Sequence, residues 1–142
     1  MLEDLDIDDT TLRGMSEVEQ ILYWRQRGPY GRLRNIITYI CWTPQRRQEF
    51  AALTREHCPD IKVFALIAAN ATRWNGDFRA IKRALELRFS LETYAARYSR
   101  TTLSDDQLDP ADWKELEDIL RILEPFHHMT LTLEGHRGHG AL

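Results

Sequence analysis

The chain has 142 residues, of which 43% are apolar and 29% charged, a composition that fits one globular domain with its own core. No apolar run is long enough to cross a membrane, and the first ten residues are acidic, so the sequence predicts neither a membrane protein nor a secreted one. Two cysteines, Cys41 and Cys58, are too few for a disulfide scaffold, which favours a reducing compartment inside the cell.

The formal net charge of -3 hides strong segregation along the chain. Residues 25–55 carry seven arginines against one acid, and residues 73–100 carry seven basic residues against three acids. Residues 1–19 and 101–124 are acidic, with seven and eight acids. The basic blocks could line a surface for a polyanion, or acidic and basic helices could pack side by side and cancel. Charge alone favours the second interpretation.

The first elements in chain order are a flexible acidic lead-in over residues 1–15 and a short helix. Ser16 is followed three residues later by Glu19, a capping-box pattern that starts a helix running through Trp24. Gly28-Pro29 is expected to break it. Residues 16–142 are expected to form the folded region that follows this lead-in.

Two further helices are predicted next. The first carries an apolar face at helical spacing, made of Leu33, Ile36, Ile37 and Ile40. Thr43-Pro44 reads as a cap followed by a first-turn proline and opens the second, which runs to about residue 57 with Phe50 and Leu53 inward.

Residues 61–69 are the one segment that predicts a β-strand, because they are apolar on both faces as in a buried central strand. A single strand cannot be stable alone, since its backbone groups need neighbouring strands. Either the segment is a buried helix, or its sheet partners lie outside this chain. We therefore expect a mainly α chain with one orphan strand, cut from a larger α/β protein.

The longest helix is predicted over residues 74–98. One apolar stripe comprises Trp74, Phe78, Ile81, Leu85 and Phe89. A second stripe beside it comprises Leu87, Leu91, Tyr94 and Tyr98. Two stripes indicate two packing partners, and Arg79, Lys82 and Arg83 fall on the remaining polar face.

After a polar loop over residues 101–108, Asp109-Pro110 caps a last helix whose inward face is Trp113, Leu116, Leu120 and Leu123. Pro125 lacks a backbone donor and clashes with the preceding turn, so a kink or break is expected there. The glycine- and histidine-rich tail over residues 135–142 shows no stop signal.

Four stretches, taken in order, resemble the hAT superfamily of DNA transposases, fungal type. They are residues 24–36 (Trp-Arg-Gln-Arg-Gly-Pro-Tyr-Gly-Arg-Leu-Arg-Asn-Ile), 43–47 (Thr-Pro-Gln-Arg-Arg), 70–75 (Asn-Ala-Thr-Arg-Trp-Asn) with the helix after it, and 112–126 (Asp-Trp to Pro-Phe). Each motif is weak alone, but four at plausible spacing are strong together. The resemblance covers nearly everything after residue 16.

Such transposases have a ribonuclease-H-like catalytic core interrupted by a helical insertion domain. The resemblance implies that residues 61–69 are a late strand of that core and that the insertion domain begins near Thr72, so the chain is expected to be an internal fragment. In the family, carboxylates hold two metal ions that cut DNA. The resemblance places those acids outside this chain, so we expect no catalytic residue and no enzyme activity. Ala69 stands where the family usually has an aspartate.

Arg73 and Trp74 are the residues that the resemblance assigns to DNA binding. In the family this tryptophan is implicated in stacking on a flipped base, with the arginine beside it. The chemistry agrees, because an indole face supports an unstacked base and a guanidinium meets phosphate. The alternative is that Trp74 begins the apolar stripe and lies in the core, and the sequence leaves the two about equal.

No cofactor and no metal site is predicted. His136 and His139 form an H-x-x-H pair near His127-His128, but the segment is glycine-rich and has no zinc-like spacing. The function that the resemblance implies is an ancestral role in binding DNA at transposon ends. The resemblance implies the nucleus as the location, and the cytoplasm is the alternative. The alternative is a small helical module that binds a protein partner or itself through exposed apolar helix faces, without affinity for DNA.

Overall fold

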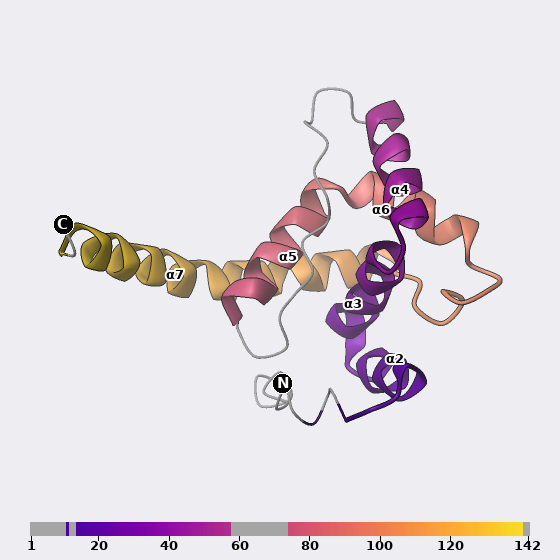
Figure 1. The fold of residues 1–142 in the computed structure, drawn as a ribbon, viewed down its shortest axis with the longest axis horizontal. Helices are drawn as coiled ribbons and strands as arrows, with labels where there is room; N and C mark the ends of the chain where they lie inside the picture. Colours follow the sequence, from indigo (N-terminus) through magenta and orange to yellow (C-terminus); the bar gives the residue numbers. More distant parts are fainter. Residues whose placement is uncertain (1–10, 12–13, 58–73, 141–142) are drawn as a thin grey trace.

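The described part of the chain is mainly helical, as the sequence predicts. The computed structural model describes residues 11, 14–57 and 74–140. This part holds six helices and no strand (Figure 1): α2 (Glu17–Arg25), α3 (Gly28–Cys41), α4 (Pro44–His57), α5 (Trp74–Glu86), α6 (Arg88–Arg97) and α7 (Pro110–Gly140). The strand predicted over residues 61–69 lies outside the described residues, so that strand and the ribonuclease-H-like core stay predictions.

Helix α3 is the centre of the packing. It contacts α2, α4 and α7, while α6 packs on α4 and α5 packs on α7 (Figure 1). The four residues of its predicted apolar face are all at most 3% exposed, which confirms that face. The core is completed by Phe50 and Leu53 of α4, Leu91 and Tyr94 of α6, and Trp113 and Leu116 of α7. Apolar burial on this face is therefore what holds the helices together.

The helix starts predicted from the sequence are confirmed by their capping bonds. The Ser16 hydroxyl accepts from the Glu19 backbone N–H at 3.2 Å, and the Thr43 hydroxyl accepts from the Arg46 N–H at 3.2 Å. At α7 the Asp109 carboxylate accepts from the Asp112 N–H at 2.7 Å. Each bond satisfies a backbone donor that the first helical turn would otherwise leave without a partner.

The predicted break at Gly28-Pro29 is also confirmed. Helix α2 ends at Arg25 and α3 begins at Gly28, whose φ of 74° lies in the left-handed region that glycine adopts at little cost. Pro29 follows in the first turn of α3, where its missing N–H has no helical partner to lose. The two residues therefore end one helix and start the next.

The prediction of a single helix over residues 74–98 is wrong in one respect, because this segment divides at Leu87 into α5 and α6. Leu87 has φ −103° and ψ 18°, outside the helical region, although its N–H still donates to the Arg83 carbonyl at 3.0 Å. The two apolar stripes have different partners, since α5 packs on α7 and α6 packs on α4. A bend lets both stripes reach them. It also leaves Phe89, which ends the first stripe, 57% exposed.

A kink or a break was expected at Pro125, and the break is wrong, because α7 continues through this residue to residue 140. Pro125 is exposed, so water can hydrogen-bond the carbonyl that loses its helical donor. The predicted inward face is confirmed, with Trp113, Leu116 and Leu123 buried and Leu120 partly so. Figure 1 shows the second half of α7 extending beyond the other helices. Neither α7 nor any other described helix combines the length and apolar character that a membrane span needs.

Candidate nucleic-acid interface

The predicted DNA-binding pair lies at the start of α5. Helix α5 begins at Trp74, so the backbone of this residue is placed, but its side chain is outside what the structure describes. Arg73 precedes the helix and is also outside the described residues. The structure therefore fixes only where the Trp74 backbone joins the fold. Whether the indole is exposed or buried stays open.

The start of α5 is held to α3 by a buried polar cluster. Asp77, in the first turn of α5, is 6% exposed. Its carboxylate accepts a hydrogen bond from the Tyr30 hydroxyl and pairs with Arg34 Nη1 at 3.5 Å. Arg34 Nη1 also donates to the Tyr30 hydroxyl oxygen at 3.2 Å. We call these three residues the α5 clamp. If the start of α5 moved away from α3, the buried Asp77 carboxylate would lose its partners, at a high cost in free energy. The clamp therefore fixes the position of this helix end.

The clamp is braced by the break between α2 and α3. The Arg34 guanidinium lies 4.0 Å above the Trp24 ring, and the Tyr30 ring meets the same indole edge-on at 6.2 Å. Gly31 allows this close approach, because a Cβ there would come within 1.7 Å of the Trp24 carbonyl oxygen. Four residues of the motif over 24–36 thus have packing roles: Trp24, Tyr30, Gly31 and Arg34. They support α5, the helix that follows the motif over 70–75.

Burial controls the ionisation of the clamp. It raises the pKa of the Asp77 carboxyl above its ordinary value, although the Tyr30 hydrogen bond and the Arg34 charge oppose the change. Burial also raises the pKa of the Tyr30 hydroxyl, while the Arg34 charge opposes this. The tyrosine therefore stays a hydrogen-bond donor at neutral pH, which suits its role toward the carboxylate.

A second buried network joins α2, α3 and the loop before α7. Asp106 is 1% exposed and accepts from Arg25 at 3.2 and 3.0 Å and from Asn35 Nδ2 at 3.0 Å. The Asn35 amide also donates to the Ile21 carbonyl at 3.0 Å. Sequence reasoning missed Asp106, because residues 101–108 read only as a polar loop. The one available signal was Asn35, which belongs to the segment 24–36 motif.

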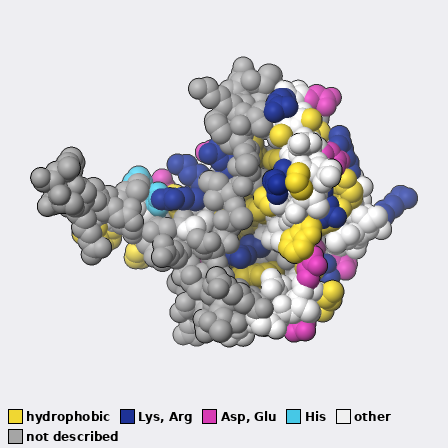
Figure 2. Space-filling view, viewed as in Figure 1, with side chains coloured by type: hydrophobic (Ala, Val, Ile, Leu, Met, Phe, Trp, Pro, Cys, Tyr) yellow, Lys and Arg dark blue, Asp and Glu magenta, His cyan; other side chains and the backbone are white. Residues whose placement is uncertain are grey.

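Several arginines of the first basic block, residues 25–55, make such contacts within the protein. Besides Arg25 and Arg34, Arg32 pairs with Asp112 at 2.8 Å and donates to the Gln107 carbonyl at 3.1 Å. Figure 2 shows, on one face, Lys and Arg side chains scattered among apolar and acidic ones. The interpretation that acidic and basic segments pack together is therefore confirmed for Arg25 and Arg32, whose partners lie in the acidic segment 101–124.

The second basic block keeps cations on the surface. Arg79 and Lys82 of α5 are exposed, three residues apart on one helix face, while Arg83 beside them pairs with Glu86 at 3.2 Å. They follow Trp74 along the same helix. The opposite face of α5 is buried through Phe78, Ile81 and Ala84. Arg79 and Lys82 therefore place positive charge on the outer face of α5, where a polyanion could reach it.

No metal centre was predicted, and the described residues contain no group of three or more His, Cys, Asp or Glu placed to hold a metal ion. His127 instead stacks on Phe78, with ring centroids 4.2 Å apart. His136 and His139 have no described side chains. The acids that the resemblance assigns to catalysis are expected beyond this chain, so this finding does not test them.

Comparison with known proteins places this helical array in a family. The family described as the ZBED1 RNase-like helical domain matches residues 15–122, which is most of the chain. The chain belongs to this family. The family is hAT-related, so the resemblance seen in the sequence is supported at this level.

One relative is a protein of Talaromyces stipitatus, tpeD, named as a candidate transcriptional regulator. It is 26% identical over 102 residues, which cover 72% of this chain but 11% of the relative. No solved structure matches. The chain thus spans about a tenth of the length of the relative it matches.

Proposed function

We propose that this chain is an internal part of a fungal-type hAT transposase, or of a protein derived from one, and that it binds DNA ends without cutting them. The observation that carries the proposal is the α5 clamp. The residues of one family motif, Tyr30 and Arg34 with Trp24 beneath them, hold the helix that begins with another, at Trp74. A site for an unstacked base needs such a rigid support.

Two further observations support DNA as the partner. Arg79 and Lys82 supply exposed positive charge on the same helix. The name of the Talaromyces relative refers to transcriptional regulation, which takes place on nuclear DNA, so we propose the nucleus as the location. Catalysis is proposed to be absent, because no acid of this sequence matches a catalytic position of the transposase family. Cutting would require carboxylates from elsewhere.

The alternative function, protein binding through the two apolar stripes, loses most of its surface in this fold. Phe78, Ile81, Leu87, Leu91 and Tyr94 are at most 3% exposed. These side chains pack within the chain itself, against α7 and α4. These five residues of the stripes are therefore core, and DNA binding at the start of α5 is the function that we retain.

The Trp74→Ala variant tests the base-stacking role. We expect binding to a hairpin or duplex with an unpaired base at its end to weaken about tenfold or more, because stacking of one base on an aromatic ring contributes roughly 1–3 kcal/mol. Binding to the fully paired duplex and the cooperative melting of the protein should not change. The measurement is fluorescence anisotropy with both DNA probes, together with thermal melting.

Trp42→Ala is the matched control, since Trp42 is 60% exposed and lies at the end of α3. It should bind both probes as the wild type does. If Trp74→Ala instead unfolds the chain, the indole belongs to the core and the stacking role is refuted. Equal loss on both DNA probes would refute it as well.

A further inference from the structure

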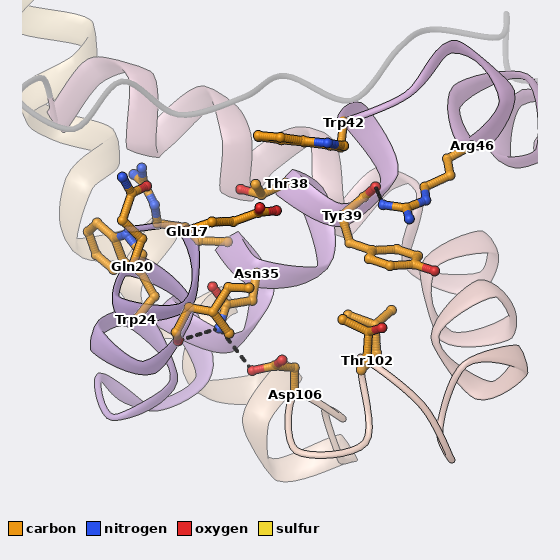
Figure 3. A pocket seen from close by; sticks show the side chains of 13 residues that line it. Glu17, Gln20, Trp24, Asn35, Thr38, Tyr39, Trp42, Arg46, Thr102 and Asp106 are labelled. Carbon is orange, nitrogen blue, oxygen red and sulfur yellow. Dashed lines mark hydrogen bonds between the residues drawn. The ribbon is translucent and has the colours of Figure 1, made fainter. Parts of the chain in front are cut away.

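A cavity of about 200 Å³ lies between α2, the junction of α3 with α4, and the loop before α7 (Figure 3). Its floor is the buried network of Asn35 and Asp106. Trp42 lies across its upper side in Figure 3, above Thr38, and Glu17 reaches in from α2. None of the functions proposed above uses these residues. The cavity combines an accessible aromatic ring with a carboxylate.

Most charged groups around the cavity already have partners. Asp106 is neutralised by Arg25, and Arg34 is engaged by Asp77. The Arg46 guanidinium lies 3.8 Å above the Tyr39 ring and donates to the Tyr39 carbonyl at 3.2 Å. These contacts turn the cationic side chains onto the protein itself.

Glu17 and Trp42 differ from these neighbours. Across the residues placed by the structure, no hydrogen bond or ion pair engages the Glu17 carboxylate, and no ring or cation stacks on the Trp42 indole. The indole is 60% exposed. An exposed tryptophan with an unmatched carboxylate at the same cavity is complementary to a flat cation, because the indole face attracts positive charge and the carboxylate accepts hydrogen bonds.

We propose that this cavity binds the guanidinium of an arginine side chain presented by a partner polypeptide. The guanidinium plane stacks on the Trp42 indole, and its N–H groups donate to the Glu17 carboxylate. Lysine fits less well, since a compact ammonium has no flat face to stack and no paired donors for the carboxylate. An anion is disfavoured, because it would approach the negative charge of Glu17 while Arg46 is held against Tyr39. This inference is independent of DNA binding at α5.

The test is a titration of the whole chain, labelled with ¹⁵N, with N-acetyl-L-arginine amide, followed through the indole N–H resonances. We expect one indole signal, removed in Trp42→Ala, to move saturably with a Kd in the millimolar range. Glu17→Gln should weaken binding roughly three- to tenfold, and N-acetyl-L-lysine amide should bind the wild type more weakly.

Glu56→Gln is the matched control, because Glu56 is exposed on α4 away from the cavity and makes the same change in charge. It should bind arginine amide as the wild type does. A Trp42 signal that does not move with arginine amide overturns the proposal, as does unchanged binding by Glu17→Gln. A signal that moves with inorganic phosphate or adenosine monophosphate but not with arginine amide also overturns it, and would assign the cavity to anions.

Discussion

Replacing Asp106 with alanine is expected to destabilise the fold by about 3 kcal/mol or more. The carboxylate is 1% exposed and accepts three hydrogen bonds, two from Arg25 and one from Asn35. Its removal leaves the buried Asn35 amide with one acceptor and the Arg25 charge without its main partner. Loss of one member of a buried ion pair costs roughly 3–5 kcal/mol. We place the value at the lower end, because a quarter of the Arg25 side chain is exposed.

The adjacent Asp105 provides the control. Its carboxylate also faces Arg25, at 3.6 Å, but its side chain is 70% exposed. Solvent screening limits such a surface pair to under about 1 kcal/mol, so Asp105→Ala should change stability little. Urea denaturation of both variants at neutral pH measures the difference in the free energy of unfolding. Similar losses for the two variants would show that the Asp106 network does not hold the loop before α7 to α2 and α3.

Gly31→Ala is expected to have a comparable effect through backbone crowding. The added methyl carbon would come within 1.7 Å of the Trp24 carbonyl oxygen, far inside contact distance. Because the obstacle is backbone, α2 and α3 must move apart, and the Trp24 indole beneath Arg34 must shift with them. Overpacking of this kind costs roughly 1–3 kcal/mol where side chains can yield, and we expect at least about 3 kcal/mol here.

Gly28→Ala separates crowding from backbone strain. Gly28 has a φ of 74°, and nothing lies within 4 Å of its added Cβ, so that variant bears only the left-handed strain of about 1–2 kcal/mol. Thermal or urea unfolding should therefore rank Gly31→Ala as the less stable of the two. The reverse order would mean that the α2–α3 approach is looser than the structure shows.

The sequence predicted the local features of the fold well, because they depend on neighbours in the chain. The caps at Ser16, Thr43 and Asp109 were recognisable, since a capping side chain bonds a backbone donor two or three residues ahead. The apolar face of α3 followed from helical spacing alone. These features needed no knowledge of the tertiary contacts.

The errors and omissions arose where tertiary contacts decide. Leu87 has no sequence signal for a bend, which follows from two stripes packing on two different helices. Pro125 stays within α7 because its turn is exposed to water. Asp106 reaches Arg25 across 81 residues of sequence, a pairing that spacing cannot predict.

The candidate site was only partly predictable from the sequence. The resemblance pointed to Arg73 and Trp74, and the structure places the start of their helix against α3. The Asp77 contribution was missed, because in the sequence Asp77 is one of three acids among seven basic residues, and its partners Tyr30 and Arg34 lie more than forty residues away. Only the fold brings the three together.

The salt dependence of DNA binding tests the central claim most directly. The wild type should bind a duplex ending in an unpaired base with an affinity that falls linearly on a log–log plot against salt concentration. In a variant carrying Arg79→Gln and Lys82→Gln, the slope should fall by about 0.9 for each phosphate that the protein no longer neutralises. Arg55→Gln with Lys114→Gln, which removes an equal exposed charge elsewhere, should leave the slope unchanged. Absence of salt-dependent binding by the wild type, or equal slopes for the two double variants, would contradict DNA binding at α5.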